Sequence, residues 1–180
     1  MNIFFLDACP KAAAQAHADT HVRKMIVETA QILSTAHRVL DGEEKIVRDA
    51  AGRRRKTYIF ADEKKNGDYY KSTHVNHPSC VWARKSAENY LWLYDLFTCL
   101  LEEYEFRFGR IHATSGLRQQ LELLPNNIES GVFSCPPATM ADEYQVEGNA
   151  VESYRNYYRL AKADLLRYTK RKPPNWIDSN

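Results

Sequence analysis

Apolar residues recur every three or four positions between His17 and His37, in a stretch without glycine or proline. This spacing is typical of an amphipathic helix whose apolar stripe faces a core. We therefore expect a first long helix from Pro10 or Lys11 to about His37, because proline is accepted in a first helical turn. The expected stripe consists of Ala18, Val22, Met25, Ile26, Thr29 and Leu33.

Polar residues of the same segment form a second row at helical spacing, made of His17, His21, Lys24, Glu28, Gln31 and Thr35. Three interpretations compete: a solvated stripe with a Lys24–Glu28 pair, a metal site on His17 and His21, or a metal-free acid–base site. In the last, Glu28 or His21 moves protons and Lys24 supplies charge or an amine. No H-E-x-x-H motif or Cys/His quartet accompanies the histidines, so we predict no metal and no cofactor.

Strand-like runs come before and after this helix. Residues 2–6 are apolar and predict a buried strand or extended lead-in, and a weaker helix is expected over residues 41–51. The dipeptide Asn66-Gly67 separates two aromatic, β-prone runs, which predicts a hairpin formed by residues 57–61 and 68–73. The basic tetrad at 53–56 is either a solvated loop or a phosphate contact.

The second half of the chain predicts further helices. One begins at Pro78 or Ser79 and ends near Phe108, with Gly109 just beyond its end. A short helix over 116–124 and an ordered loop over 125–148, which contains three prolines, are expected next. Asn149 and Glu152 have the spacing of a helix cap and open a final helix to about residue 170.

Together these elements predict one mainly α domain over residues 1–180. It is a compact bundle of three long helices with a small β-hairpin insertion at 57–73, a long proline-containing loop, and an extended tail at 171–180 anchored by Trp176. The four cysteines show no C-x-x-C spacing or disulfide framework, which indicates reduced thiols and a cytoplasmic protein. No apolar run reaches the roughly 18 residues of a membrane span.

Two more segments carry candidate binding groups, although the net charge of +2 does not itself predict nucleic-acid binding. His77, Arg84 and Asn89 would place donors near the start of a helix, where anions bind; alternatively, His77 only caps the helix. Between residues 155 and 172, seven basic residues accompany one acidic residue. With interleaved tyrosines they favour phosphate and base contacts, or else tyrosines facing the core and arginines facing water. Glu103 and Arg107, four residues apart, are expected to form a structural pair.

Several motifs together resemble a group of small, mostly uncharacterised phage-type proteins, and they cover most of the chain. They are M-x-I-F-x-L-D at 1–7, D-x-H-V-x-K-M-x-x-E-x-x-Q at 19–31, H-P-x-x-x-W-x-R-x-S-x-x-N at 77–89, E-Y-x-x-R at 103–107, a Y-R-x-Y-Y helix from residue 154, and a Pro/Trp ending at 173–176.

More distantly, the order of elements is similar to that of the phage-type pyrimidine-dimer DNA glycosylases. That resemblance implies an all-α fold and base excision by attack of an amine at the sugar C1′, with one glutamate, matched here by Glu28, stabilising a Schiff base. The family's nucleophile is the α-amine of residue 2 after methionine removal. Bulky Asn2 hinders that removal, so the amine would be that of Met1, or Lys24 would replace it. The tail and residues 40–75 are additional to the family pattern.

We therefore expect a DNA-processing enzyme, glycosylase/lyase-like or base-modifying, that acts on a damaged or modified nucleotide flipped out of double-stranded DNA in the host cell cytoplasm. The expected catalytic residues are Glu28, Lys24, His21 and Asp19. The expected nucleic-acid contacts are His77, Arg84, Asn89, Tyr158, Lys162 and Arg171. Two alternatives remain: a nucleotide or small-molecule transferase using the same pocket, and a non-catalytic phage factor that binds nucleic acid or a host protein.

Overall fold

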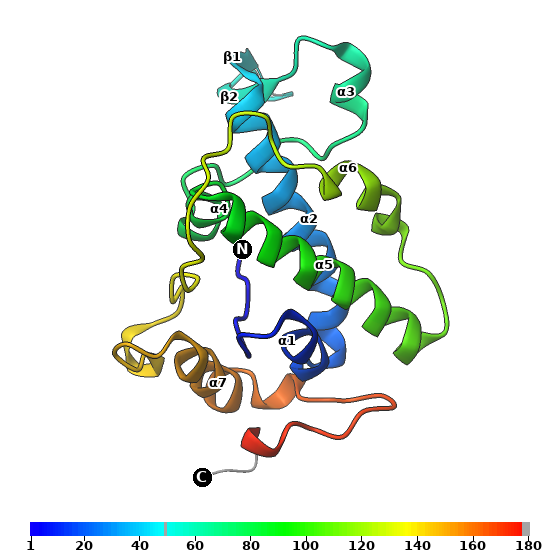
Figure 1. Cartoon of the computed structure of the whole chain (residues 1–180), viewed down its shortest axis with the longest axis vertical. Coiled ribbons are helices and arrows are strands. Elements are labelled where there is room, and N and C mark those ends of the chain that lie inside the picture. Colours follow the sequence, from blue (N-terminus) through cyan, green and yellow to red (C-terminus); the bar gives the residue numbers. More distant parts are fainter. Residues whose placement is uncertain (49, 178–180) are drawn as a thin grey trace.

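The computed structural model describes residues 1–48 and 50–177 and confirms a mainly helical fold with one small antiparallel hairpin (Figure 1). These residues form seven α-helices rather than the three long helices expected. The two longest, α2 (Asp19–Asp41) and α5 (Ala87–Phe108), pack against each other. Their apolar faces form the centre of the core, and every member of the predicted α2 stripe is buried.

The predicted first helix is divided into α1 (Pro10–Ala16) and α2, with extended backbone at His17 between them. Arg107 on α5 accounts for the break. Its guanidinium donates to the carbonyl oxygens of Gln15 (2.9 Å) and His17 (2.8 Å). In a continuous helix these oxygens would accept hydrogen bonds from residues four positions later.

The predicted second long helix is also divided, into α4 (Pro78–Ala83) and α5. Ser86 begins α5, because its Oγ accepts a hydrogen bond from the backbone N–H of Asn89 (3.3 Å). Serine is among the preferred residues at this capping position. Gly109 ends α5 with a left-handed φ of 66°, as predicted.

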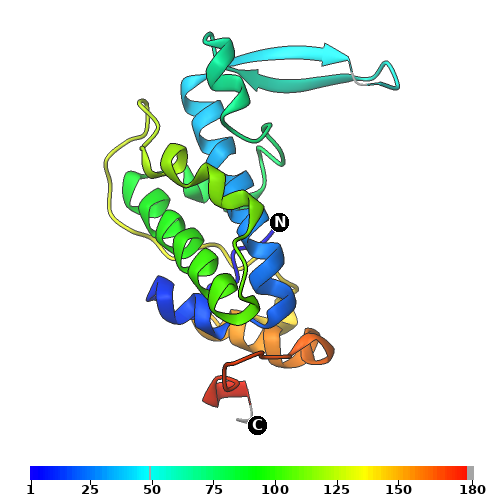
Figure 2. The same cartoon turned by 90° about the vertical axis from the view of Figure 1, so that its right-hand side faces the viewer.

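The β-hairpin lies earlier in the chain than predicted. Strands β1 (Glu43–Arg48) and β2 (Arg54–Ile59) pair antiparallel and extend away from the helices (Figure 2). A short helix, α3 (Glu63–Gly67), occupies the predicted turn. The hairpin expected from 57–61 and 68–73 is therefore wrong. So is the helix expected over 41–51, of which residue 49 lies outside the described residues.

Asn66 forms no hairpin turn because its side chain closes the loop between β2 and α3. Its Oδ1 accepts hydrogen bonds from the Phe60 N–H (3.0 Å) and from Arg38 (2.9 Å), and its Nδ2 donates to the Phe60 carbonyl oxygen (2.8 Å). Arg38 is buried and also donates to the carbonyl oxygens of Tyr69 and Tyr70. This buried polar network outweighs the local turn preference of Asn-Gly.

An ordered loop over residues 125–148 follows η1 (Ala113–Leu117) and α6 (Arg118–Glu122), which replace the predicted helix over 116–124. The loop contains one short 3-10 turn, η2 (Asp142–Tyr144). It is tied to the helices by side chains that contact its beginning and its middle. The Asp41 carboxylate accepts from the backbone N–H groups of residues 126 and 127, and the Trp82 indole donates to the Ser134 carbonyl oxygen (2.8 Å).

The last helix, α7 (Ala150–Ala161), begins at the predicted cap, where Asn149 Oδ1 accepts from the Glu152 N–H (3.0 Å). It ends well before residue 170 because the chain folds back onto the start of α2. There the Asp19 carboxylate accepts from the N–H and hydroxyl of Thr169 (3.0 and 2.7 Å).

The chain after α7 forms two 3-10 turns, η3 (Ala163–Leu165) and, in the tail, η4 (Asn175–Ile177). Trp176 packs edge-on to Tyr158, with ring centroids 6.2 Å apart, and lies under the Arg155 guanidinium. Of the predicted tail, residues 178–180 lie outside the described residues. All four cysteines are free thiols. In the part of the chain described, no helix combines the length and apolar character needed to cross a membrane.

Candidate active site

Lys24 and Glu28 lie one helical turn apart on the outer face of α2. Lys24 Nζ is 3.2 Å from Glu28 Oε1, and the two side chains differ strongly in exposure, at 61% for lysine and 16% for glutamate. An exposed amine beside a mostly buried carboxylate can reach a substrate while the carboxylate remains in place. This pair is the chemical centre of the candidate site.

The amino-terminal segment holds Glu28 from the other side. The backbone N–H of Asn2 donates to Glu28 Oε2 over 3.1 Å. The Asn2 side chain in turn accepts from the N–H groups of Ile3 (2.7 Å) and Phe4 (2.9 Å). Phe4 has a positive φ of 51°, which is rare for a bulky residue and is stabilised here by these bonds. The Glu28 carboxylate is therefore held on both oxygens.

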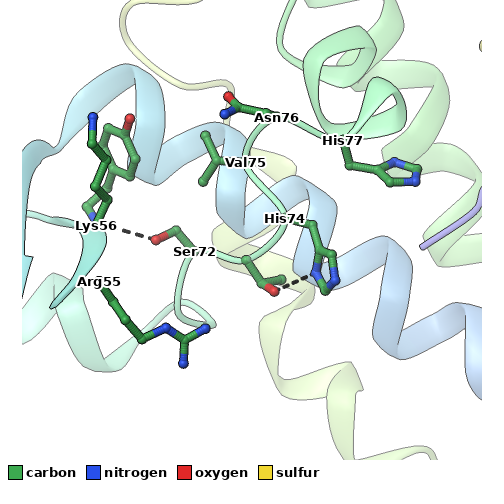
Figure 3. Close-up of a pocket in the computed structure, with 9 residues that line it drawn as sticks. Arg55, Lys56, Ser72, His74, Val75, Asn76 and His77 are labelled. Atoms are coloured by element: carbon green, nitrogen blue, oxygen red, sulfur yellow. Dashed lines mark hydrogen bonds between the residues drawn. The ribbon is translucent and has the colours of Figure 1, made fainter. Parts of the chain in front are cut away.

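His77 approaches this pair from the loop before α4. Its Nδ1 accepts from the backbone N–H of Ser79 (3.2 Å), so the neutral ring carries its proton on Nε2. The pKa of His77 is lowered by burial, then by the positive charge at the amino end of the chain and by His74, while Glu28 raises it. His77 is therefore within electrostatic range of Glu28, and in Figure 3 its ring points toward the amino-terminal segment. We call Lys24, Glu28 and His77 the Glu28 cluster.

His21 lies beside the Glu28 cluster but is buried. Its Nδ1 is 2.6 Å from the Tyr158 hydroxyl, and its ring stacks on Phe4 at a centroid distance of 4.6 Å. The pKa of His21 is lowered to about 4, first by burial and then by the charges of Lys24 and Lys162, against the opposing effect of Glu28. The imidazole is thus neutral at pH 7, packed under the cluster and without direct access to solvent.

Tyr158 and Lys162, both predicted as nucleic-acid contacts, occupy different environments. Tyr158 is fully buried on α7, and its hydroxyl is engaged by His21. Lys162 is partly exposed, with its Nζ 4.9 Å from the centroid of the Tyr157 ring. Only the lysine is therefore available to a ligand.

Asp19 and Arg171, predicted as catalytic and phosphate-binding residues, belong to a structural ion-pair network. Arg107 is buried at its centre and contacts Asp19 Oδ1 (2.9 Å) and Glu103 Oε1 (2.6 Å). Arg171 donates to both oxygens of Glu103. In Asp19, hydrogen bonds from Thr169 and Arg107 outweigh the effect of burial and lower the pKa. The expected structural pairing of Glu103 with Arg107 is present within this larger network.

Arg84 and Asn89 also turn inward rather than toward a ligand. Arg84 is half-buried and donates to the Val75 carbonyl oxygen (2.7 Å), which supports the loop before α4. Asn89 is fully buried. Its Nδ2 donates to the Trp82 carbonyl oxygen and to Ser134 Oγ, and its Oδ1 accepts from the Ser134 N–H. Of the four groups Lys24, Glu28, His77 and Arg84, the first two are in direct contact, and His77 is within electrostatic range of Glu28.

An open pocket of about 610 Å³ adjoins His77 (Figure 3). One wall comes from β2, with Arg55, Lys56 and Tyr58, and the other from residues 72–77. A second hollow, of about 500 Å³, shares several of these residues. It is also lined by Gln31 of α2 and by Lys71 of the loop before α4. Gln31 is one turn beyond Glu28, so these hollows connect the hairpin with the face of α2 that carries the Glu28 cluster.

Sequence reasoning assigned no role to the residues of this pocket other than His77 and the ambiguous basic tetrad. The missed residues include His74, whose Nδ1 is 2.7 Å from Thr73 Oγ1. The repeated histidines of T-H-V-N-H at 73–77 were the available signal. The predicted hairpin strand at 68–73 ends directly before these histidines and gives them no shared environment.

The alternative metal site on His17 and His21 has few free ligand atoms. His17 is fully buried, its Nδ1 contacts the Ala13 carbonyl oxygen (2.6 Å), and its pKa is lowered by burial to about 3. Within the described residues no group of three or more His, Cys, Asp or Glu side chains is arranged to hold a metal ion.

Comparison with protein-family models, with curated proteins and with solved structures finds no match to this chain. The groups of this protein that can act chemically are those of the Glu28 cluster and of the pocket beside it.

Proposed function

We propose that the protein is a DNA-processing enzyme of the glycosylase/lyase type, in which the Lys24 amine attacks the sugar of a flipped nucleotide and Glu28 stabilises the resulting cation. The observation that supports this proposal is the 3.2 Å contact between an exposed amine and a mostly buried carboxylate, beside a basic pocket. An ion pair that served only to stabilise the surface would add little to the free energy of folding, so burial of its carboxylate favours a role in chemistry.

In this scheme the Lys24 ammonium first loses a proton to solvent, and its nitrogen then forms a bond to C1′ as the bond between C1′ and the base breaks. The base leaves with the proton that the attacking amine gives up. The C1′–O4′ bond then opens, O4′ takes a proton from solvent in the open pocket while the Nε2–H of His77 donates a hydrogen bond to it, and a protonated Schiff base remains on Lys24. Its positive charge forms next to the Glu28 carboxylate, whose orientation is already fixed by Asn2.

Other predicted residues take supporting parts. His21 packs beneath the cluster and helps to position Lys24, while the partly exposed Lys162 lies where it can contact a phosphate. Asp19, Asn89, Tyr158 and Arg171 contribute to folding rather than to chemistry in this proposal.

Borohydride trapping tests the proposal directly, because it reduces a Schiff base to a stable amine. Duplexes carrying an abasic site, a pyrimidine dimer or a modified pyrimidine are incubated with the protein and borohydride, and the adduct is mapped by mass spectrometry. We expect a covalent adduct on the peptide that contains Lys24, lost in Lys24→Met and retained in Lys85→Met, an exposed lysine between α4 and α5.

Two results would overturn the proposal. The absence of an adduct on every duplex substrate would remove the glycosylase/lyase assignment. An adduct on the amino-terminal peptide, with normal trapping by Lys24→Met, would remove the assignment of Lys24 as nucleophile.

A further inference from the structure

We infer that the β-hairpin, residues 43–59, is an arm that grips the phosphate backbone of double-stranded DNA beside the Glu28 cluster. The inference deepens the proposed function and rests on it for the choice of DNA as ligand. It assigns a role to a segment of the protein that contributes little to the core.

The hairpin is exposed to an unusual degree. Every residue of β1 is exposed, and β2 becomes partly buried only from Thr57 onward. The two strands project from the end of α2 as a free ribbon (Figure 2). Two-stranded hairpins are marginally stable on their own, so a ribbon that buries so little surface is poorly explained by packing alone.

Positive charge is concentrated in this ribbon. Residues 43–59 hold six basic and three acidic residues, an excess of three positive charges in a chain whose net charge is only +2. The rest of the protein therefore has a slight negative excess. A basic ribbon on a near-neutral body is the charge distribution expected of a segment that binds a polyanion.

The strand register places like charges against each other. Arg48 lies directly opposite Arg54 in the antiparallel pair, and Arg55 follows opposite Val47. Directly opposed like charges destabilise a hairpin. Phosphate groups between them would relieve this repulsion, so the arrangement itself indicates an anionic ligand.

Uncompensated charges continue from the ribbon toward the cluster. Among the described residues, neither Arg55 nor Lys71 has a carboxylate partner, whereas Lys56 pairs with Glu44 at 2.8 Å. Arg55 lines both hollows between the ribbon and the body, one reaching His77 and the other Gln31. A backbone held by the ribbon would thus pass directly beside the cluster.

The dimensions of the ribbon suit duplex DNA. Two strands about 4.8 Å apart, each about 20 Å long for six residues, fit a B-form major groove about 12 Å wide. The major groove of duplex RNA is too narrow and deep for such a ribbon. The ribbon therefore favours DNA over RNA.

The test compares two triple variants of equal charge. The ribbon variant is Arg48→Gln, Arg54→Gln and Arg55→Gln. The control removes three exposed basic residues outside the ribbon, one just after α5 and two in the segment after α7, with Arg110→Gln, Arg167→Gln and Lys172→Gln. Binding of a fluorescent 20-base-pair DNA duplex, a single strand and an RNA duplex is measured by anisotropy at several salt concentrations.

We expect the ribbon variant to bind duplex DNA at least about ten-fold more weakly and to lower the slope of log affinity against log salt by roughly two to three. The control should change both quantities much less. The thermal unfolding midpoint of the ribbon variant should change little, because the lost repulsion between Arg48 and Arg54 offsets the lost hydrogen bond from Arg48 to the Gly52 carbonyl oxygen (2.9 Å). Equal losses in the two variants, or tighter binding of duplex RNA than of duplex DNA by the wild type, would overturn the inference.

Trapping and binding separate this inference from the proposed function. Glu28→Gln should bind duplex DNA as the wild type does, while forming far less adduct. If no substrate is ever trapped but the ribbon variant loses its salt-dependent binding, the enzyme proposal fails and the ribbon proposal stands. If trapping occurs and the two triple variants bind equally, the reverse holds.

Discussion

The Glu28 carboxylate accepts a hydrogen bond from the backbone N–H of Asn2, 3.1 Å away, while its other oxygen lies 3.2 Å from Lys24 Nζ. Glu28 thereby connects the beginning of the chain with the middle of α2. The carboxylate has a fixed orientation before any substrate arrives, which is what stabilisation of a developing positive charge requires.

Glu28→Gln should separate chemistry from stability. The glutamine amide oxygen can still accept from the Asn2 N–H, and the lost pair with exposed Lys24 is worth less than about 1 kcal/mol. The negative charge is lost, so trapping on an abasic duplex should fall by about 10²- to 10⁴-fold. Borohydride trapping and urea unfolding measure the two effects. Glu105→Gln, on the exposed face of α5, is the matched control, and equal trapping by both variants would argue against a catalytic Glu28.

Arg107→Met should destabilise the fold strongly. The substitution leaves Glu103 buried with one cationic partner fewer and removes the donors that hold the break between α1 and α2. Loss of one member of a buried ion pair typically costs about 3–5 kcal/mol in unfolding free energy.

The control for this change is Arg118→Met, which breaks a pair between exposed side chains, with Arg118 Nη2 3.7 Å from Glu102 Oε1. It should cost less than about 1 kcal/mol. Chemical denaturation measures both variants, and similar losses would show that the buried network does not stabilise the fold as described.

Acid should weaken the fold because two buried histidines resist protonation in the folded state. Burial lowers the pKa of His21 and His37 to about 4 in the folded protein, whereas an unfolded histidine titrates near 6.5. The unfolded state therefore binds more protons between these values. The contribution is complete above about pH 6.5 and is lost as the pH falls toward 4, at about 1.4 kcal/mol per pKa unit for each group.

Urea unfolding between pH 7.5 and 4.5 measures this dependence. His37→Gln should make the pH dependence shallower, because it removes one of the titrating groups. The glutamine can still donate to the Tyr90 hydroxyl, which lies 2.9 Å from His37 Nε2, so the fold should be retained. His74→Gln, at an exposed position, should leave the dependence unchanged. A flat stability profile for the wild type over this range would contradict the assignment.

Tyr158→Phe should reduce stability without affecting DNA binding. The substitution leaves buried His21 without the hydroxyl at 2.6 Å, and an unsatisfied buried polar group costs about 1–3 kcal/mol. Because Tyr158 is fully buried, duplex affinity should stay within about two-fold of the wild type. Tyr144→Phe, at a largely solvent-accessible turn, serves as control. A large loss of affinity in Tyr158→Phe alone would restore the tyrosine as a nucleic-acid contact.

The parts of the fold that depend on neighbouring residues were predictable from the sequence. The buried stripe of α2, the end of α5 at Gly109 and the cap at Asn149 all follow from local spacing and backbone preference. The helix breaks did not, because the side chain that separates α1 from α2 belongs to Arg107, about 90 positions further along the chain. The hairpin was misplaced for the same reason, since Arg38 draws Asn66 into a buried network.

In the candidate site too, contacts between neighbouring residues were predictable and contacts between distant residues were not. The contact between Lys24 and Glu28 was implied by helical spacing, whereas the bond from Asn2 joins residues 26 positions apart. Arg84 and Asn89 have the residue types of a binding site, but they serve internal carbonyl and amide groups instead. Residue type and spacing identify a polar face, and tertiary contacts decide which members of it remain free.

The hairpin has a further consequence for the handling of the protein. With only two strands, β1 has one side whose backbone groups have no strand partner among the described residues, and Ile46 and Val47 are 54% and 40% exposed. Such an edge can recruit the same strand from another molecule, and positive charge opposes this self-association. The arginines that hold a ligand would thus also keep the free protein dispersed, and concentrated salt, by screening them, should promote clustering of the molecules.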